Sequence, residues 1–198
     1  MPYIALNHKI DRRVKNDIGS NEILKPIAHL NFEEPAAKSI TAILEATDLT
    51  DEEQTITEGI TDPDVARNIR IKASKSGTDP VAGDVVVHGT NINNDAISET
   101  LTLDDETDVA GDKAFKTITS VELPIETNAG EDGVVVGTDN KLGIPYKLEL
   151  NTILKAYRDG NLEGTDPTVA TDTGNIEENT ILLDSALNGT DVDVLLIV

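Results

Sequence analysis

The stretch from Gly59 to Pro124 decides the fold class of this chain. It reads GITDPDVARNIRI at 59–71, GDVVVHGTNI at 83–92, AISETLTL at 96–103 and AFKTITSVELP at 114–124. Each piece is short and rich in Val, Ile and Thr, and polar turns separate the pieces. Apolar and polar residues alternate along them, which is typical of half-buried β-strands joined by tight connections. The stretch therefore predicts β-structure throughout.

The same pattern continues on both sides of this stretch. Residues 35–46 fit either a helix or a strand, and we favour a strand because β-type sequence follows. The last seven residues, VDVLLIV, are apolar enough to predict a strand buried in a sheet centre or between subunits. Gly-Thr-Asp turn signals occur at Gly77, Gly137, Gly164 and Gly189. The predicted strands are residues 54–57, 65–73, 84–88, 97–103, 115–123, 134–136, 146–154, 176–183 and 192–198.

Helical and strand patterns do not alternate along the chain, so a parallel sheet is not expected. Frequent turns favour a sandwich or barrel. The chain has 198 residues, of which 38% are hydrophobic, with 3 Tyr, 2 Phe and no Trp. Its core must therefore be built from Val, Ile and Leu, which pack well on pleated sheets. We predict an all-β fold: an antiparallel β-sandwich or barrel-like body with an extended N-terminal arm.

Charge divides the chain into an arm, residues 1–34, and a body, residues 35–198. The net charge is −21. Residues 1–30 carry five basic residues against three acidic ones, a net +2, which leaves −23 for the rest. Apolar residues in this segment follow no sustained period, so it is either an extended arm that docks on a partner or an element packed on its own body. The candidate partner-binding residues are Lys9, Arg12, Arg13, Lys15 and Lys25.

The residues that usually carry catalysis form no recognisable pattern. There is no Cys, and His8, His29 and His88 have no metal-ligand spacing. Neither a phosphate-binding glycine loop nor a nucleophile elbow is present. The acidic runs at 51–53 and 104–108 do not match a calcium loop, and we interpret them as solvated turns. We expect no enzymatic activity, no cofactor and no metal ion.

Net charge and hydropathy also bear on partners. A chain of charge −21 is repelled by nucleic acid and by anionic membranes, so neither is an expected partner. The sequence has no run of about 18 apolar residues, so no membrane span is predicted. The N-terminal sequence MPYIALNHK lacks the pattern of a signal peptide, so secretion by that route is not expected.

Several segments together resemble a family of virion structural proteins of tailed bacteriophages. The resemblance extends over roughly residues 46–198, marks turns and strand pairing, and leaves the arm outside. The residues that carry it are 47–50 (TDLT), 59–68 (GITDPDVARN), 83–90 (GDVVVHGT), 98–103 (SETLTL), 114–117 (AFKT), 142–145 (LGIP), 179–180 (NT) and 187–190 (LNGT).

The resemblance implies a particle-bound β-protein of the capsid decoration, or cement, type. Such a protein is made in the host cytoplasm, binds the major capsid protein or another virion protein on the outer capsid surface, and forms a homo-oligomer, such as a trimer. A tail or baseplate β-module is an alternative within the virion. A carbohydrate-binding adhesive β-sandwich is an alternative from a different class.

Overall fold

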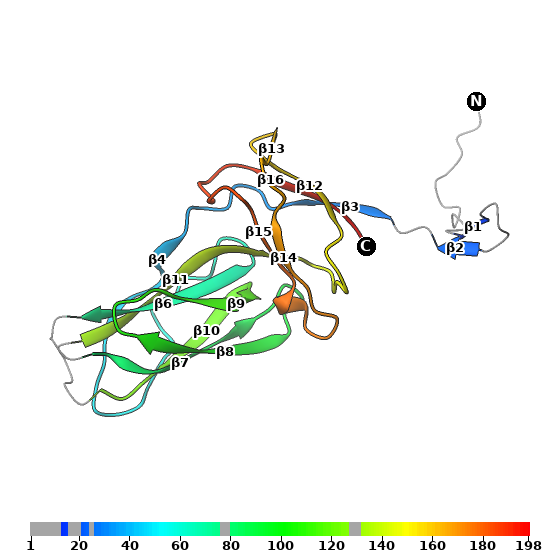
Figure 1. The fold of residues 1–198 in the computed structure, drawn as a ribbon. Coiled ribbons are helices and arrows are strands. Elements are labelled where there is room, and N and C mark those ends of the chain that lie inside the picture. Colours follow the sequence, from blue (N-terminus) through cyan, green and yellow to red (C-terminus); the bar gives the residue numbers. More distant parts are fainter. Residues whose placement is uncertain (1–12, 16–20, 24–25, 76–79, 127–131) are drawn as a thin grey trace.

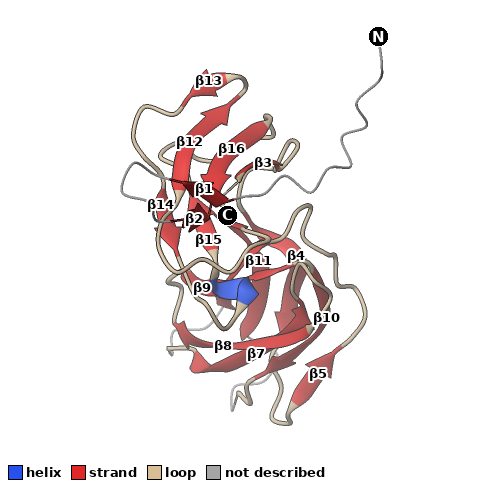
Figure 2. Ribbon diagram, turned by 90° about the vertical axis from the view of Figure 1, so that its right-hand side faces the viewer, coloured by secondary structure: helices blue, strands red, loops and turns tan. Residues whose placement is uncertain are grey.

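The computed structural model describes residues 13–15, 21–23, 26–75, 80–126 and 132–198. Within these residues all paired strands run antiparallel, and the only helical element is one 3₁₀ turn, η1 (Ile176–Glu178). The strands form curved sheets that stack on one another (Figure 1, Figure 2). The prediction of an all-β, antiparallel fold is confirmed.

Two sheets make a sandwich. The first has the strand order β5 (Gln54–Ile56), β10 (Thr117–Leu123), β7 (Ala82–Thr90) and β8 (Ala96–Asp104). The second has the order β14 (Thr168–Ala170), β15 (Thr180–Leu182), β11 (Asp132–Gly143), β6 (Arg67–Lys75) and β9 (Val109–Phe115). A sixth strand, β4 (Ser39–Asp48), also pairs with β11, along its first half, whereas β15 pairs with the end of β11.

The space between these sheets holds the first hydrophobic cluster, which we call the sandwich core. Alternate residues of β7 and β10 point into it, including Val85, Val87 and Val121, none of which is exposed. Phe115 is its only aromatic member, so the predicted aliphatic core is confirmed for this part of the chain. β-Branched side chains fill it because they pack well on a pleated face.

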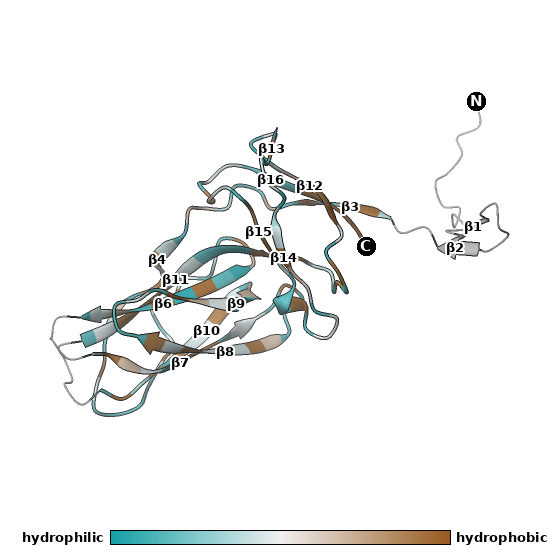
Figure 3. Ribbon diagram, viewed as in Figure 1, coloured by the Kyte–Doolittle hydropathy of each residue, from teal (hydrophilic) through white to brown (hydrophobic). Residues whose placement is uncertain are grey.

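A third sheet, the C-terminal sheet, has the order β13 (Asn161–Leu162), β12 (Ile153–Arg158), β16 (Val192–Ile197) and β3 (Ile27–Asn31). Its inner face covers a second hydrophobic cluster, the C-terminal core. Val192, Val194 and Leu196 of β16 are completely buried there. The C-terminal strand therefore lies in a sheet centre, as its apolar sequence predicts. Hydrophobic residues lie on strands of both the sandwich and the C-terminal sheet (Figure 3).

Four predicted strands differ from the structure. The run 115–123 breaks at Lys116, because β9 ends at Phe115 in one sheet and β10 starts at Thr117 in the other. Residues 146–152 are irregular rather than a strand, and the strand begins only at Ile153. Residues 176–178 form η1 before the short strand β15. The predicted strand 134–136 is only the middle of β11, which runs to Gly143.

The four Gly-Thr-Asp signals do not share one role. Gly137 lies inside β11, where a Cβ would stand 1.9 Å from the Ser39 carbonyl oxygen, so glycine allows β4 to approach closely. Gly189 has a φ of 77° and fits the predicted turn. Gly164 lies in a bend outside the strands, and Gly77 lies outside the described residues.

The predicted arm divides at β3. β1 (Arg13–Lys15) and β2 (Asn21–Ile23) pair with each other and, among the described strands, with no other. Figure 1 shows them beyond the start of β3. β3 pairs with β16 along its full length, so residues 27–31 are part of a folded sheet. Of the two alternatives predicted for the N-terminal segment, residues 27–31 therefore follow the second, an element packed on its own body.

Candidate functional site

A groove lies between the segment that follows β3 and the segment that precedes β6. Two cavities of about 500 and 660 Å³ make it up, and they share Asn31, Glu33, Asp64 and Val65. Pockets of this size that combine apolar and polar groups are the usual places for ligand binding. The other lining residues are Phe32, Glu34, Asp62, Pro63, Ala66, Ile92, Lys116, Thr117, Gly143 and Asp191.

The first wall is set by the end of β3. The Asn31 side-chain oxygen accepts a hydrogen bond from the backbone N–H of Glu33 at 2.9 Å, which closes a tight turn. Glu33 has a φ of 57°, an unusual conformation for a residue with a side chain. Backbone bonds from Phe32 N–H to the Val192 oxygen (2.9 Å) and from Val192 N–H to the Glu33 oxygen (3.0 Å) hold the turn against β16. The wall is therefore fixed to the C-terminal sheet.

The second wall is set by a buried guanidinium. Arg67 is 0% exposed, and its Nη1 donates to Asp64 at 3.0 Å and to the Ala36 carbonyl at 3.0 Å. Its Nε donates to the Asp139 carbonyl of β11 at 2.7 Å. Asp64 also accepts a hydrogen bond from the Ala36 N–H at 2.6 Å. These bonds pair the buried charge through Nε and Nη1, leave Nη2 without a partner among the described residues, and hold Asp64 beside the groove.

The groove is lined by apolar side chains, among them Phe32, Val65 and Ile92, and by five carboxylates, which we call its acidic rim. The five are Glu33, Glu34, Asp62, Asp64 and Asp191, against a single lining cation, Lys116.

Not all of these carboxylates are engaged within the protein. Asp62 accepts the Ile118 N–H at 2.8 Å, and Asp191 accepts the Asn31 amide at 2.9 Å. The exposed side chains of Glu33 and Glu34 make no hydrogen bond or ion pair with any described residue. The arrangement suits a cationic ligand with apolar side chains and disfavours an anion.

The outer face of the C-terminal sheet is a second feature, next to the groove. Ile27 of β3 is 64% exposed and Leu162 of β13 is 53% exposed. Ile27 stands opposite Ile197 of β16, so the start of β3 lies in an apolar part of this face. A face of this kind is a possible contact surface for another protein.

The other end of β3 is polar. Asp193 of β16 accepts a hydrogen bond from the Asn31 amide at 3.0 Å, and its Oδ1 lies 2.6 Å from His29 Nε2. The Asn31 bond, with a smaller contribution from His29, lowers the pKa of Asp193 against the opposing effect of burial. This cluster joins β3 to β16 beside the groove.

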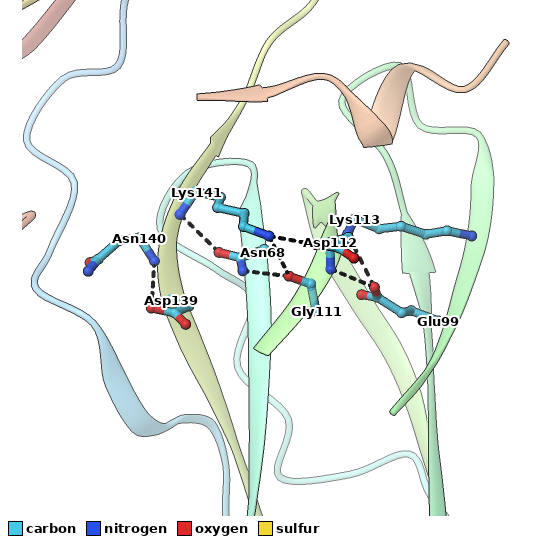
Figure 4. Close-up of polar contacts among 8 residues, drawn as sticks. All are labelled: Asn68, Glu99, Gly111, Asp112, Lys113, Asp139, Asn140 and Lys141. Carbon is cyan, nitrogen blue, oxygen red and sulfur yellow. Dashed lines mark hydrogen bonds and ion pairs between the residues drawn. The ribbon is translucent and has the colours of Figure 1, made fainter. Parts of the chain in front are cut away.

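A polar network around the buried Asn68 links β6, β8, β9 and β11 (Figure 4). Asn68 is completely buried, donates to the Gly111 carbonyl at 2.7 Å and accepts the Lys141 N–H at 3.0 Å. It replaces ladder bonds where the register of β6 shifts against both neighbours. Sequence reasoning missed it, although an Asn amid the apolar residues of a strand is a signal for such a role.

Glu99 belongs to the same network and closes the gap between β8 and β9. Its Oε1 accepts the N–H groups of Asp112 at 2.7 Å and Lys113 at 3.3 Å. Burial raises the pKa of the Glu99 carboxyl, although these hydrogen bonds oppose the shift. Because Glu99 joins β8 and β9, the edge strands of the two sheets, we interpret it as a structural residue.

The structure places the sequence-predicted partner-binding residues only in part. Arg13 and Lys15 are the first and last residues of β1. Lys9, Arg12 and Lys25 lie outside the described residues.

The histidines and the acidic turn have structural partners. His88 Nε2 lies 3.0 Å from Glu122 Oε1, and the His29 ring contacts Asp193, whereas His8 lies outside the described residues. The acidic turn at 104–108 is exposed to solvent, as predicted, and two of its carboxylates also form ion pairs: Asp105 with Lys75 at 3.0 Å and Asp108 with Arg70. Among the described residues no three acidic or histidine side chains are grouped to hold a metal ion.

No protein-family model, curated protein or solved structure matches this chain. In the part of the chain that the structure describes, no helix has the length and hydropathy of a membrane span.

Proposed function

We propose that this chain is a structural protein of a tailed-bacteriophage virion, most specifically a capsid decoration protein that binds the outer surface of the head. The N-terminal segment contacts the major capsid protein, and the acidic body faces the solvent. Many copies occupy equivalent positions on the particle. The resemblance of residues 46–198 to such proteins suggests this role, and the architecture of the chain is consistent with it.

The observation that best supports the proposal is the place where the basic segment joins the body. Residues 1–25 carry a net charge of +2, and they lead directly into β3, the edge strand of the C-terminal sheet. One edge of β3 pairs with β16, and the other has no partner among the described strands. The exposed Ile27 lies at the start of this strand. A basic segment, an apolar residue and an open edge thus adjoin one another.

This junction is firmly held, as an attachment point requires. β3 pairs with β16 from Ile27↔Ile197 to Asn31↔Asp193. The Val198 N–H also donates to the Pro26 carbonyl at 3.0 Å, just before β3 begins. Leu30 and Ala28 pack against the C-terminal core. A force on the N-terminal segment is therefore passed to a buried central strand rather than to a loop.

Co-sedimentation with empty particles of the virus that encodes the chain tests this function, followed by imaging of the decorated particles. We expect saturable binding and additional density at repeated positions on the outer surface of the head. Because an acidic body carries a basic segment, binding should weaken as ionic strength rises.

The same images distinguish the alternatives. Density confined to the tail or baseplate would replace the decoration role with that of a tail module. A chain that neither binds particles nor occurs in purified virions, as judged by mass spectrometry, would overturn the proposal.

A further inference from the structure

We propose that the acidic groove between β3 and β6 binds the basic stretch at residues 9–15 of a second copy of this chain. This inference concerns contacts between copies in solution, and its test uses no particle. It therefore stands or fails apart from the contact with the capsid that the function proposed above gives to the same N-terminal segment.

The groove offers two kinds of contact at once. Glu33 and Glu34 are exposed and unpaired among the described residues, so they can bind cations without breaking an internal bond. Asp64 is already neutralised by Arg67 and serves to shape the rim. Val65 lines both cavities and is half-buried, so it presents apolar surface between the carboxylates. The ligand that fits carries Lys or Arg together with aliphatic side chains.

The chain itself contains such a ligand. Residues 9–15 read KIDRRVK, with four cations, one anion and two aliphatic residues, a net charge of +3. Residues 26–198, by contrast, carry −23. Opposite charges of this kind raise the rate of encounter and favour one partner over others. The basic stretch and the groove are therefore complementary both in charge and in apolar content.

The direction of β3 favours a second copy over the same chain. The groove begins at Asn31, at the end of β3, whereas the N-terminal segment leaves from its start. Five residues of strand separate the two by about 17 Å. Figure 1 also shows β1 beyond the start of β3, on the side away from the segment that follows it. Binding within one chain requires the segment to turn back along β3, whereas binding to a neighbour does not.

Disulfide trapping between two single-cysteine chains tests the inference, since the natural sequence contains no cysteine. One full-length chain carries an affinity tag and Ile10→Cys, activated as a mixed disulfide with a small thiol, and the other carries Val65→Cys in the groove as a free thiol, which displaces that small thiol. The position control is Thr57→Cys, an exposed residue that lines neither cavity. Each rate is normalised to the reaction of the same thiol with a small neutral disulfide.

A matched pair of charge variants isolates the rim. Glu33→Gln with Glu34→Gln in the Val65→Cys chain removes the two free carboxylates of the groove. Glu52→Gln with Glu53→Gln removes the same charge from another exposed pair, which lines neither cavity. Loss of nearby carboxylates by itself makes a thiol more reactive, because the thiolate forms more readily. A slower reaction in the groove variant therefore reports weaker capture.

We expect the tagged chain to form a mixed dimer with Val65→Cys at least about tenfold faster than with Thr57→Cys. The Glu33/Glu34 variant should lose most of this advantage, and the Glu52/Glu53 variant should keep it. Equal rates at positions 65 and 57 would overturn the inference. So would equal behaviour of the two charge variants.

Discussion

The two hydrophobic cores of this protein are built in different ways. The sandwich core takes all its buried residues from positions 43–136, and most of them lie on regular strands. The C-terminal core draws on residues 142–196 and is covered by β3, which lies far away in the sequence. Long irregular segments connect its short strands. The comparison shows that long paired strands enclose the first core, whereas short strands and irregular segments, tied together by the buried side chain of Asn179, close much of the second.

Asn179 shows how the second region is organised. It is 0% exposed, and its Oδ1 accepts the N–H groups of Leu148 at 2.8 Å and Asp172 at 2.9 Å. Its amide donates to the carbonyls of Asp172 and Asn175, both at 2.8 Å. One side chain therefore satisfies backbone groups of two irregular segments, which sheet pairing would otherwise do.

The largest effect is expected at Arg67, which joins the sandwich to the groove wall. Arg67→Ala leaves the carbonyls of Ala36 and Asp139 without this donor and Asp64 without its cation. We expect a loss of about 3–5 kcal/mol in the free energy of unfolding, because two carbonyl groups lose a charged donor and each such hydrogen bond is worth about 1.5–3 kcal/mol. Urea denaturation measures it. Lys72→Ala on the same strand should change stability by less than about 0.5 kcal/mol, and an equal loss there would contradict the assignment.

The next effect separates the two regions. Asn179→Ala should lower stability by about 2–4 kcal/mol, because several buried backbone groups lose their partners. Hydrogen exchange should show the loss of protection around residues 144–148 and 168–182, with little change in β7 and β10. Asn161→Ala, at an exposed position, is the control. A uniform loss of protection in both cores would show that the two regions do not differ in this way.

The converse substitution acts on the sandwich. Gly137→Ala puts a Cβ 1.9 Å from the Ser39 carbonyl oxygen, so β4 must move away from β11. We expect a loss of about 1–3 kcal/mol, as in other overpacked sites. Gly164→Ala is matched in chemistry but meets no atom within 4 Å. Thermal melts that are equal for the two variants would refute the close approach of β4.

The smallest effect is a pH dependence within the sandwich. Because burial raises the pKa of Glu99 above its usual 4.5, the folded state holds this proton more tightly than the unfolded state. Its contribution to stability is present below pH 4.5 and is lost as the pH rises through the folded-state pKa. Glu99→Gln carries no charge, so its stability relative to the natural protein should rise between pH 4.5 and neutrality. A relative stability that falls over this range would contradict the raised pKa.

Sequence patterns predict the sandwich well, because alternation directly records which face of a strand is buried. β7, β8, β10 and β16 lie where the alternation or apolar runs place them. Apolar and polar residues alternate in residues 146–152 too. There, however, the backbone N–H of Leu148 donates to the Asn179 side chain and not to a neighbouring strand. A contact of this kind depends on residues distant in the sequence, which local patterns do not record.

The groove could not be predicted from the sequence. Its acidic residues are visible as Glu33-Glu34 and Asp62-Pro63-Asp64, but many other acidic runs look the same. The two segments meet because β3 pairs with β16 and because Arg67 binds both Ala36 and Asp64. The basic residues of the arm, in contrast, can be recognised from the sequence, because positive charges are few in a chain whose net charge is −21.

The central claim is that the folded body begins at β3 and that the preceding segment carries the binding to the particle. Two truncations test it: removal of residues 1–25, which spares β3, and removal of residues 1–31, which strips β3 from β16. The shorter truncation should melt like the full chain and fail to co-sediment with empty particles. The longer one should melt at a clearly lower temperature, because the C-terminal core loses its cover. A shorter truncation that unfolds, or that binds particles as well as the full chain, would contradict the claim.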